Sequence, residues 1–136
     1  MLRAVVDTNI LLEGLTRKKD PGRVVDAWAA RRFLPCVSTA LALEYEEVLI
    51  DKFGAARRDQ VLGALQALLN RVEFTPILSR VRPLSPDPDD DFVIECAFNA
   101  NALIVTHNLR DLAIANSALG IVVVTATEFL TLLEKK

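Results

Sequence analysis

Residues 2–12 read LRAVVDTNILL, and this stretch decides the fold class. The apolar run over residues 2–6 is typical of a buried strand, and it stops at the carboxylate of Asp7. Asn9 and the apolar residues 10–12 indicate a short helix that begins directly after that strand. A buried strand that passes through a polar residue into a helix is the opening of a β–α unit.

The same alternation continues along the chain. Further strands are expected at residues 33–37, 72–77, 102–106 and 121–124. Further helices are expected at residues 24–32, 38–54, 57–70, 89–99 and 128–134, with a polar break over 16–22 and a proline-rich loop over 80–88. Ser38 should cap its helix, and Pro35 argues for an edge strand or a strand start. The pattern predicts an α/β fold with a parallel sheet and helices on both faces, which binds ligands beyond the carboxyl ends of its strands.

Composition limits the class of protein. The 136 residues predict a single domain over 1–136, and 51% hydrophobic with 25% charged residues excludes a disordered chain. No apolar run reaches the roughly 20 residues of a membrane span, and Asp7 interrupts the start too early for a signal peptide. The formal charge of −2 is not that of a protein that coats nucleic acid. Cys36 and Cys96 are expected to be buried, reduced thiols of a cytoplasmic protein.

Carboxylates and amides gather where the predicted strands end. The candidates are Asp7 after the first strand, Glu44 two turns into the helix after Ser38, the aspartates 87 and 89–91 before the fourth strand, and Asn108 and Asp111 after it. Carboxylates that converge repel one another, and proteins usually offset this repulsion by binding a divalent cation between them. Oxygen ligands suit Mg²⁺ or Mn²⁺, while the single histidine, His107, excludes a histidine-rich zinc or iron centre.

Missing motifs exclude other chemistries. The chain has no GxxxxGK[ST] motif of P-loop proteins, no GxSxG motif of serine hydrolases and no GxGxxG motif of dinucleotide-binding proteins. Asp7-Thr8-Asn9 is not the DxD of haloacid-dehalogenase-type phosphatases, and no lysine stands between Lys52 and Lys135 to serve a phosphoryl-aspartate mechanism.

Four segments in order resemble the PIN domain family. The segment 7–11, DTNIL, is similar to its opening motif, and 38–49, STALALEYEEVL, to its second. The segment 87–97, DPDDDFVIECA, resembles the third motif, in which an aspartate precedes an alanine by seven residues, so Asp90 is favoured over Asp91. The segment 104–112, IVTHNLRDL, resembles the fourth. Among PIN domains, the chain looks most like the VapC-like toxins of toxin–antitoxin pairs.

The resemblance implies a three-layer α/β/α sandwich with a five-stranded parallel sheet. It also implies an endoribonuclease that depends on Mg²⁺ or Mn²⁺ and hydrolyses RNA phosphodiester bonds with a metal-activated water. Asp7, Glu44 and Asp90 map onto the acids that hold the metal, and Asp111 is the choice for the fourth acid. Many relatives carry an aspartate where this chain has Asn108. The implied partners are RNA, a cognate antitoxin and further copies of the chain in a homodimer or higher homo-oligomer.

Several residues are expected to support these acids or to act in other ways. Asn9, Thr106, Asn108 and Asp91 are the supporting candidates, and Asp7 could instead cap the helix that follows it. The basic residues 17–19 and Arg23 could contact phosphate at the rim, or form an ordinary solvated loop. Asn108 also leaves open a catalytically weak or inactive PIN module that binds RNA or a protein partner. A flap-type DNA nuclease shares the acids, but 136 residues leave no room for its insertions.

Overall fold

The computed structural model of the chain describes residues 1–16, 19–80 and 88–135, and the side chains of all of these except residues 88–90. The strands are β1 (Arg3–Val6), β2 (Leu34–Val37), β3 (Glu73–Phe74), β4 (Leu103–Val105) and β5 (Val123–Val124). The helices are α1 (Thr8–Leu15), α2 (Lys19–Ala29), α3 (Thr39–Phe53), α4 (Arg58–Leu69), α5 (Pro88–Ala100), α6 (Ala113–Leu119) and α7 (Ala126–Glu134), and a 3-10 turn (Ala55–Arg57) precedes α4.

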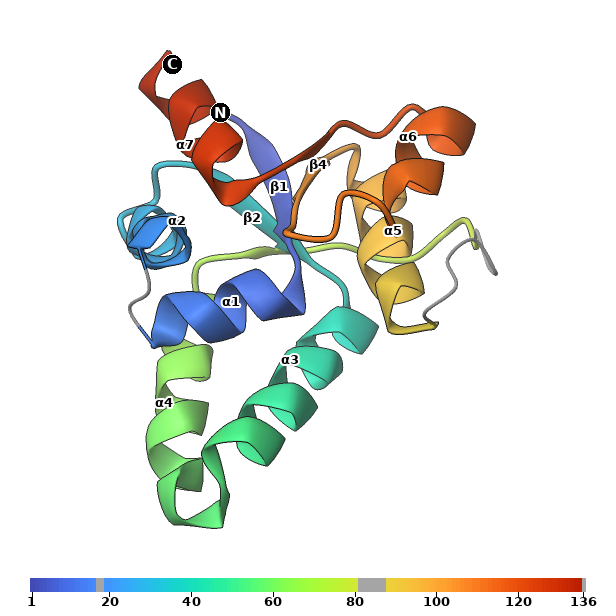
Figure 1. Cartoon of the computed structure of the whole chain (residues 1–136). Coiled ribbons are helices and arrows are strands. Elements are labelled where there is room, and N and C mark those ends of the chain that lie inside the picture. The colour runs from blue at the N-terminus through green and yellow to red at the C-terminus, as the bar shows by residue number, and fades with distance from the viewer. Residues whose placement is uncertain (17–18, 81–87, 136) are drawn as a thin grey trace.

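The five strands form one parallel sheet in the order β3-β2-β1-β4-β5. Figure 1 shows α2 and α5 on opposite sides of this sheet, with α3 and α4 extending away from it as a pair. The helix α5 packs on β1, β2 and β4, while α2 packs against α1 and α7. The α/β class, the parallel sheet and the five strands all agree with the sequence prediction.

The core lies between the helices and the two central strands. Val5 on β1 and Ile104 on β4 have no exposed surface, like most residues beside them. On the α2–α7 side, the ring of Phe33 stands edge-on against Trp28 and Phe129, with ring centroids 6.4 and 4.9 Å apart. Burial of such apolar surface is the main contribution that holds the layers together.

Pro35 is the second residue of β2, which is an interior strand, so the strand-start alternative fits and the edge-strand alternative is wrong. Leu34 donates its N–H to the carbonyl of Leu2, directly before β1, so the N–H of Cys36 faces β1 as well, and the proline nitrogen faces β3. The pairing with β3 starts only at Cys36–Glu73. The missing N–H of Pro35 therefore removes no bond from the ladder.

Three elements, α2, α6 and β3, show the clearest differences from the sequence prediction. The helix α2 already begins at Lys19, inside the expected break, because Pro21 is tolerated in a first helical turn. The helix α6 was not expected, since only Ala115 of its seven residues is buried and its apolar pattern is weak. The strand β3 has two residues where six were expected. Most of the expected loop over 80–88 lies outside the described residues.

The short strand β3 is held by a side chain that reaches across from β1. The guanidinium of Arg3 donates two hydrogen bonds to the carboxylate of Glu73, at 2.9 and 2.5 Å, and a third to the carbonyl of Ala100 at 2.9 Å. The hydrogen bond from Arg3 lowers the pKa of Glu73 below its usual value. Over the described ranges, no helix has the length and apolar character needed to cross a membrane.

Candidate active site

The strand order reverses between β1 and β4, and this reversal places the candidate site. The chain moves outward from β1 to β2 and β3, then returns to β4 on the other side of β1. In open α/β sheets, ligands bind beyond the carboxyl ends of the strands at such a reversal, so the residues that follow β1 and β4 are the candidates. Asp7 directly follows β1, and Thr106 directly follows β4.

Asp7 is a buried carboxylate, with 6% of its surface exposed. Its N–H donates to the carbonyl of Val105 at 2.9 Å, and its own carbonyl accepts from the N–H groups of Ile10 and Leu11. The residue occupies the N-cap position of α1, yet its side chain accepts no capping hydrogen bond there. The carboxylate instead accepts a hydrogen bond from the Thr106 hydroxyl at 2.6 Å. The capping alternative for the Asp7 side chain is therefore wrong.

A chain of hydrogen bonds continues from Asp7 to Asp111. The Oγ1 of Thr106, which donates to Asp7, also accepts the main-chain N–H of Asn108 at 2.9 Å. The side-chain amide of Asn108 then donates to Oδ2 of Asp111 at 2.8 Å. Four residues that the sequence analysis singled out thus form one connected group at the carboxyl ends of β1 and β4. Asn108 lies inside this group as the donor that holds Asp111.

The second predicted acid lies on α3. This helix begins at Ser38, whose hydroxyl accepts the N–H of Leu41 at 3.1 Å, and ends at Gly54, where φ is +84°. Both ends agree with the sequence prediction. Glu44 is half-buried in the second turn of the helix, and the next residue, Tyr45, is fully buried. The helix packs against α1, which directly follows Asp7, and against α5, which carries Asp90.

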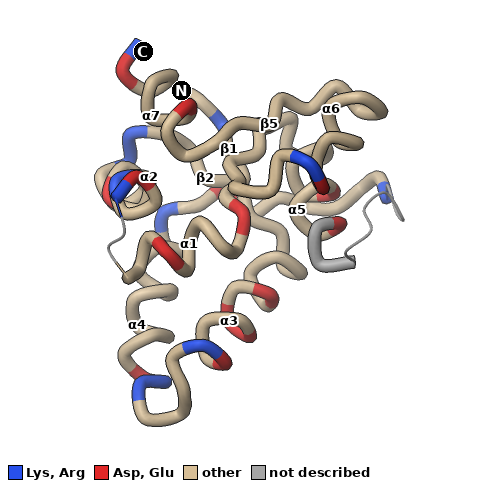
Figure 2. The backbone as a smooth tube through the Cα atoms, in the orientation of Figure 1, with Lys and Arg blue, Asp and Glu red and all other residues tan. Residues whose placement is uncertain are grey.

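The third predicted acid lies in the first turn of α5. The side chain of Asp90 is not among those described, so its separation from Asp7 and Glu44 stays a prediction. Its neighbour Asp91 is buried, with 5% of its surface exposed. Figure 2 shows acidic positions at the end of β1, along α3 and at the start of α5.

Glu95 is a second buried acid of α5, and the sequence analysis did not select it. It lies one turn after Asp91 and is 3% exposed. Its backbone carbonyl accepts from Asn99, whose side chain also binds the backbone of Leu78 and Ser79. The available signal was a single acid inside the apolar run of residues 92–97. Burying a carboxylate costs free energy unless the group has a partner, so an acid within an apolar run indicates a candidate structural or functional residue.

An ion pair between His107 and Glu13 lies on the elements that follow these two strands. The Nε2 of His107, on the loop after β4, pairs with a carboxylate oxygen of Glu13 on α1. Asn9 is exposed on the first turn of α1, and Arg110 is exposed beside Asp111. Of the expected basic rim, residues 17 and 18 lie outside the described residues, and Arg23 pairs with Asp20 at 3.2 Å.

The donors at this site fit a hard divalent cation. Carboxylate and amide oxygens are the ligands that Mg²⁺ and Mn²⁺ prefer. Among the side chains of residues 1–16, 19–80 and 91–135, no three Asp, Glu, His or Cys groups lie together as a metal site would require. Mg²⁺ often binds through only one or two carboxylates and keeps several waters, so the chemistry of the donors, carboxylate and amide oxygens, fits this ion.

The fold and the site define the class as an α/β sandwich with hydrogen-bonded acidic side chains at its strand-order reversal. The chain matches the family model of the PIN domain over residues 3–110. It therefore belongs to the PIN domain family. Among curated proteins, none matches the chain.

Solved structures agree with this fold. A structure of VapBC2 from Rickettsia felis, bound to a DNA fragment from its promoter, matches with a TM-score of 0.65 and 14% identity, over 91% of this chain and 98% of the other. DNA-bound VapBC from Salmonella typhimurium matches with a TM-score of 0.65 and 16% identity, over 93% and 99%. VapBC-1 from nontypeable Haemophilus influenzae matches with a TM-score of 0.64 and 18% identity, also over 93% and 99%.

Proposed function

We propose that this PIN domain is an endoribonuclease that depends on Mg²⁺ or Mn²⁺. The observation that supports this most is Asp7, a buried carboxylate at the strand-order reversal whose side chain is held by Thr106 rather than used as a helix cap. A buried acid costs stability unless it is hydrogen-bonded or serves a function. Its position at the carboxyl ends of β1 and β4 is where folds of this kind bind their ligands.

The residues of the site have distinct parts in the proposal. Asp7, Glu44 and Asp90 would hold the cation, with Asp111 as a fourth acid. The Thr106 hydroxyl fixes one oxygen of Asp7, and Asn108 fixes one oxygen of Asp111, so both carboxylates are oriented before any ion binds. A divalent cation bound there would supply Lewis-acid polarisation of the scissile phosphate and lower the pKa of a bound water.

The toxin role and the partners extend the proposal. The solved relatives are VapBC structures, and the four motifs resemble VapC-like toxins. We therefore assign this chain to the toxin half of a toxin–antitoxin pair, which acts on RNA in the cytoplasm as a homodimer or higher homo-oligomer and is inhibited by a cognate antitoxin. Growth arrest on expression in a bacterial host, relieved by Asp7→Asn, tests the toxin role.

Asn108 favours one alternative, a PIN module that binds RNA or a protein partner with little or no cleavage. A neutral amide occupies a position where many relatives carry an acid, and it donates its N–H to Asp111. An amide oxygen binds a divalent cation more weakly than a carboxylate does.

Cleavage of single-stranded RNA separates the two functions. The active enzyme should cut RNA with Mn²⁺ or Mg²⁺, stop with EDTA, recover with added metal, and leave 5′-phosphate and 3′-hydroxyl ends. Asp7→Asn, purified in parallel, controls for contaminating nucleases. RNA binding without metal-dependent cleavage would favour the binding module instead.

A pair of variants tests which acid of α5 takes part. Asp90→Asn should abolish cleavage if the motif register is right, while Asp91→Asn should then have the smaller effect. Because Asp91 is buried, the alternative result is also of interest, namely that Asp91→Asn reduces cleavage more than Asp90→Asn does. In that case the third acid would be reassigned to Asp91, and the rest of the proposal would stand.

A further inference from the structure

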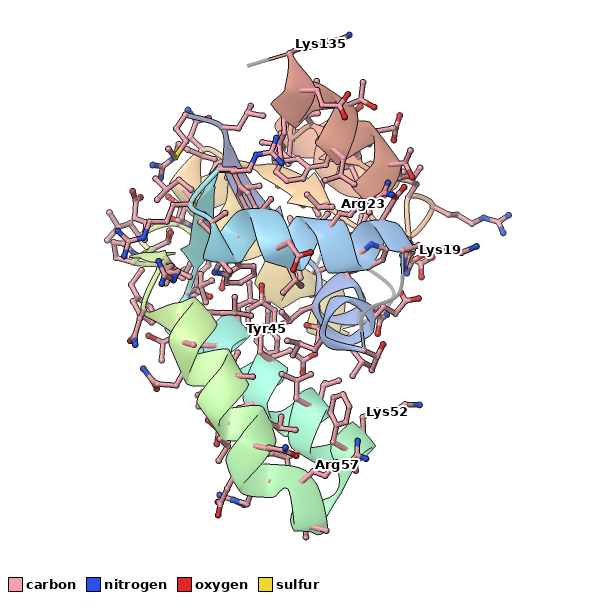
Figure 3. The ribbon with its side chains drawn as sticks, turned by 90° about the vertical axis from the view of Figure 1, so that its left-hand side faces the viewer. Lys19, Arg23, Tyr45, Lys52, Arg57 and Lys135 are labelled. Atoms are coloured by element: carbon pink, nitrogen blue, oxygen red, sulfur yellow. The ribbon has the colours of Figure 1, made fainter. Side chains whose placement is uncertain are left out.

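Tyr45 is the only tyrosine of the chain, and it is completely buried. It lies on the inner face of α3, between the buried residues Leu41 and Leu49. Figure 3 shows its side chain in the interior, below α2, whereas the labelled lysine and arginine side chains lie at the periphery. Its ring packs against Trp28 at 6.4 Å between centroids.

A buried hydroxyl needs a partner, and this one has a specific partner beneath the site. The hydroxyl of Tyr45 donates to the carbonyl oxygen of Val6 at 2.5 Å. The pairing of β1 with β2 is registered at Arg3–Leu34 and Ala4–Pro35, two residues before Val6. The tyrosine thus supplies a donor at the point where β2 has turned away into α3.

This bond fixes the peptide unit that leads into Asp7. On the β4 side, the N–H of Asp7 donates to the carbonyl of Val105 at 2.9 Å. On the other side, the carbonyl of the same peptide unit accepts from Tyr45. The backbone of Asp7 is therefore held from both sides, while the Thr106 hydroxyl orients its carboxylate.

The same bond reaches both of the predicted metal acids. Val6 is covalently joined to Asp7, and Tyr45 is covalently joined to Glu44. We propose that Tyr45 is a positioning residue whose hydrogen bond to Val6 sets the spacing between Asp7 and Glu44 for a divalent cation. This inference rests on the proposed function, and it adds a residue that binds neither the metal nor the RNA.

Tyr45→Phe tests the inference, because it keeps the ring and removes only the hydroxyl. Loss of a group that supports metal ligands typically weakens metal binding by about 10–100-fold. We expect the Kd for Mn²⁺, measured from free Mn²⁺ by electron paramagnetic resonance, to rise about tenfold. The kcat for RNA cleavage should fall while KM for RNA stays unchanged. Phe129→Leu is the control, because Phe129 is equally buried but packs on Phe33 on the α7 side.

The control separates positioning from general loss of stability. The inference holds if Tyr45→Phe weakens Mn²⁺ binding while Phe129→Leu lowers Tm and leaves Mn²⁺ binding unchanged. It is overturned if Tyr45→Phe binds Mn²⁺ as the unmodified protein does, or if both variants lose affinity in proportion to Tm. If the unmodified protein binds no Mn²⁺, the proposed function falls and this inference falls with it.

A second measurement needs no destabilising variant. Because Tyr45 is the only tyrosine, labelling with 3-fluorotyrosine gives one ¹⁹F resonance. We expect Mg²⁺ to shift this resonance with the same Kd that calorimetry gives for Mg²⁺ binding, and Asp7→Asn to abolish the shift. A resonance that does not move while calorimetry detects Mg²⁺ binding would overturn the coupling between Tyr45 and the metal acids.

Discussion

The two ends of the same parallel sheet differ in chemistry. At the carboxyl end, Asp7, Thr106, Asn108 and Asp111 form a connected polar group. At the amino end, beside the starts of β4 and β5, there is a hollow of about 460 Å³ lined largely by apolar residues, among them Phe98, Leu119 and Val122.

Helix polarity explains the difference. The carboxyl end of a parallel strand leads into the N-terminus of a helix, where unpaired N–H groups and the helix dipole favour carboxylates. The amino end receives helix C-termini, and here three of them close through left-handed residues. Arg31 follows α2 with φ of +59°, Asn101 follows α5 with φ of +53°, and Gly120 follows α6 with φ of +69°. The comparison predicts that variants at the carboxyl end change metal binding, while variants at the amino end change only stability.

The largest expected effect is that of Asp7→Asn at the carboxyl end. The substitution keeps the shape and removes the charge, so Mn²⁺ affinity and RNA cleavage should fall by more than about a hundredfold, beyond the typical cost of losing a supporting group. The fold should remain, as judged by circular dichroism and Tm. Cleavage equal to that of the unmodified protein would place any nuclease activity at another site.

Asn108→Asp should act in the opposite direction. A charged oxygen replaces an amide, so the Kd for Mn²⁺ should fall about tenfold, which corresponds to about 1.4 kcal/mol. Without metal, the new carboxylate would lie beside Asp111 at the position where the amide now donates, so Tm should decrease until Mn²⁺ is added. Calorimetry and thermal melts check both effects. A variant with unchanged Mn²⁺ affinity would show that position 108 does not face the ion.

Gly120→Ala perturbs the amino end alone. A Cβ at Gly120 would meet no atom within 4 Å, so the cost comes from the left-handed backbone, about 1–2 kcal/mol. Chemical denaturation should report this loss of stability, and Mn²⁺ affinity should stay the same. A change in Mn²⁺ affinity would contradict the separation of the two ends.

The last expected effect is absent at neutral pH: it lies between the two ends and appears only in alkali. Burial raises the pKa of Cys36 to about 11 and that of Cys96 to about 12, from an ordinary value of 9.0. Below about pH 9 the folded and unfolded states both keep these protons, so stability does not depend on them. Above pH 9 the unfolded chain releases them first, so stability falls, by up to about 1.4 kcal/mol per pH unit for each thiol.

Denaturation measured from pH 8 to pH 11 checks this dependence. In Cys36→Ala, the free energy of unfolding should fall less steeply above pH 9. Below pH 8 the substitution should not change how the free energy of unfolding depends on pH. An unchanged slope in Cys36→Ala would show that the thiol is not the source. Tyr45, whose pKa is also raised, adds to the decline in the unmodified protein at the upper end of this range.

Local patterns predicted the elements with strong signals. The apolar run that stops at Asp7, the Ser38 cap and the Gly54 end of α3 each depend on a few neighbouring residues, and all three appear in the structure. The helix α6 escaped prediction because a helix with one buried residue has almost no apolar period. Pro35 left an edge strand and a strand start open, because its effect depends on which neighbouring strand its nitrogen faces, and the sequence of a single strand does not carry that information.

The candidate site divides in the same way. The motifs named Asp7, Thr106, Asn108 and Asp111, but not the bonds that join them or the donor role of the Asn108 amide. Glu95 was not selected because the sequence of a single helix does not show which of its side chains the rest of the fold will bury. The spacing of Asp7, Glu44 and Asp90 stays a prediction.

The sequence by itself determined that this protein alternates buried strands with helices and that its acids stand at strand ends and helix starts. These properties follow from the spacing of apolar residues and from helix-capping residues, and both can be recognised within a few neighbouring positions. The tertiary structure alone decided that β4 returns beside β1, so that Thr106 meets Asp7 across 99 positions of the chain, and that Tyr45 reaches Val6 across 39. Such contacts depend on strand order and helix packing, because only the assembled sheet brings distant residues within hydrogen-bonding distance.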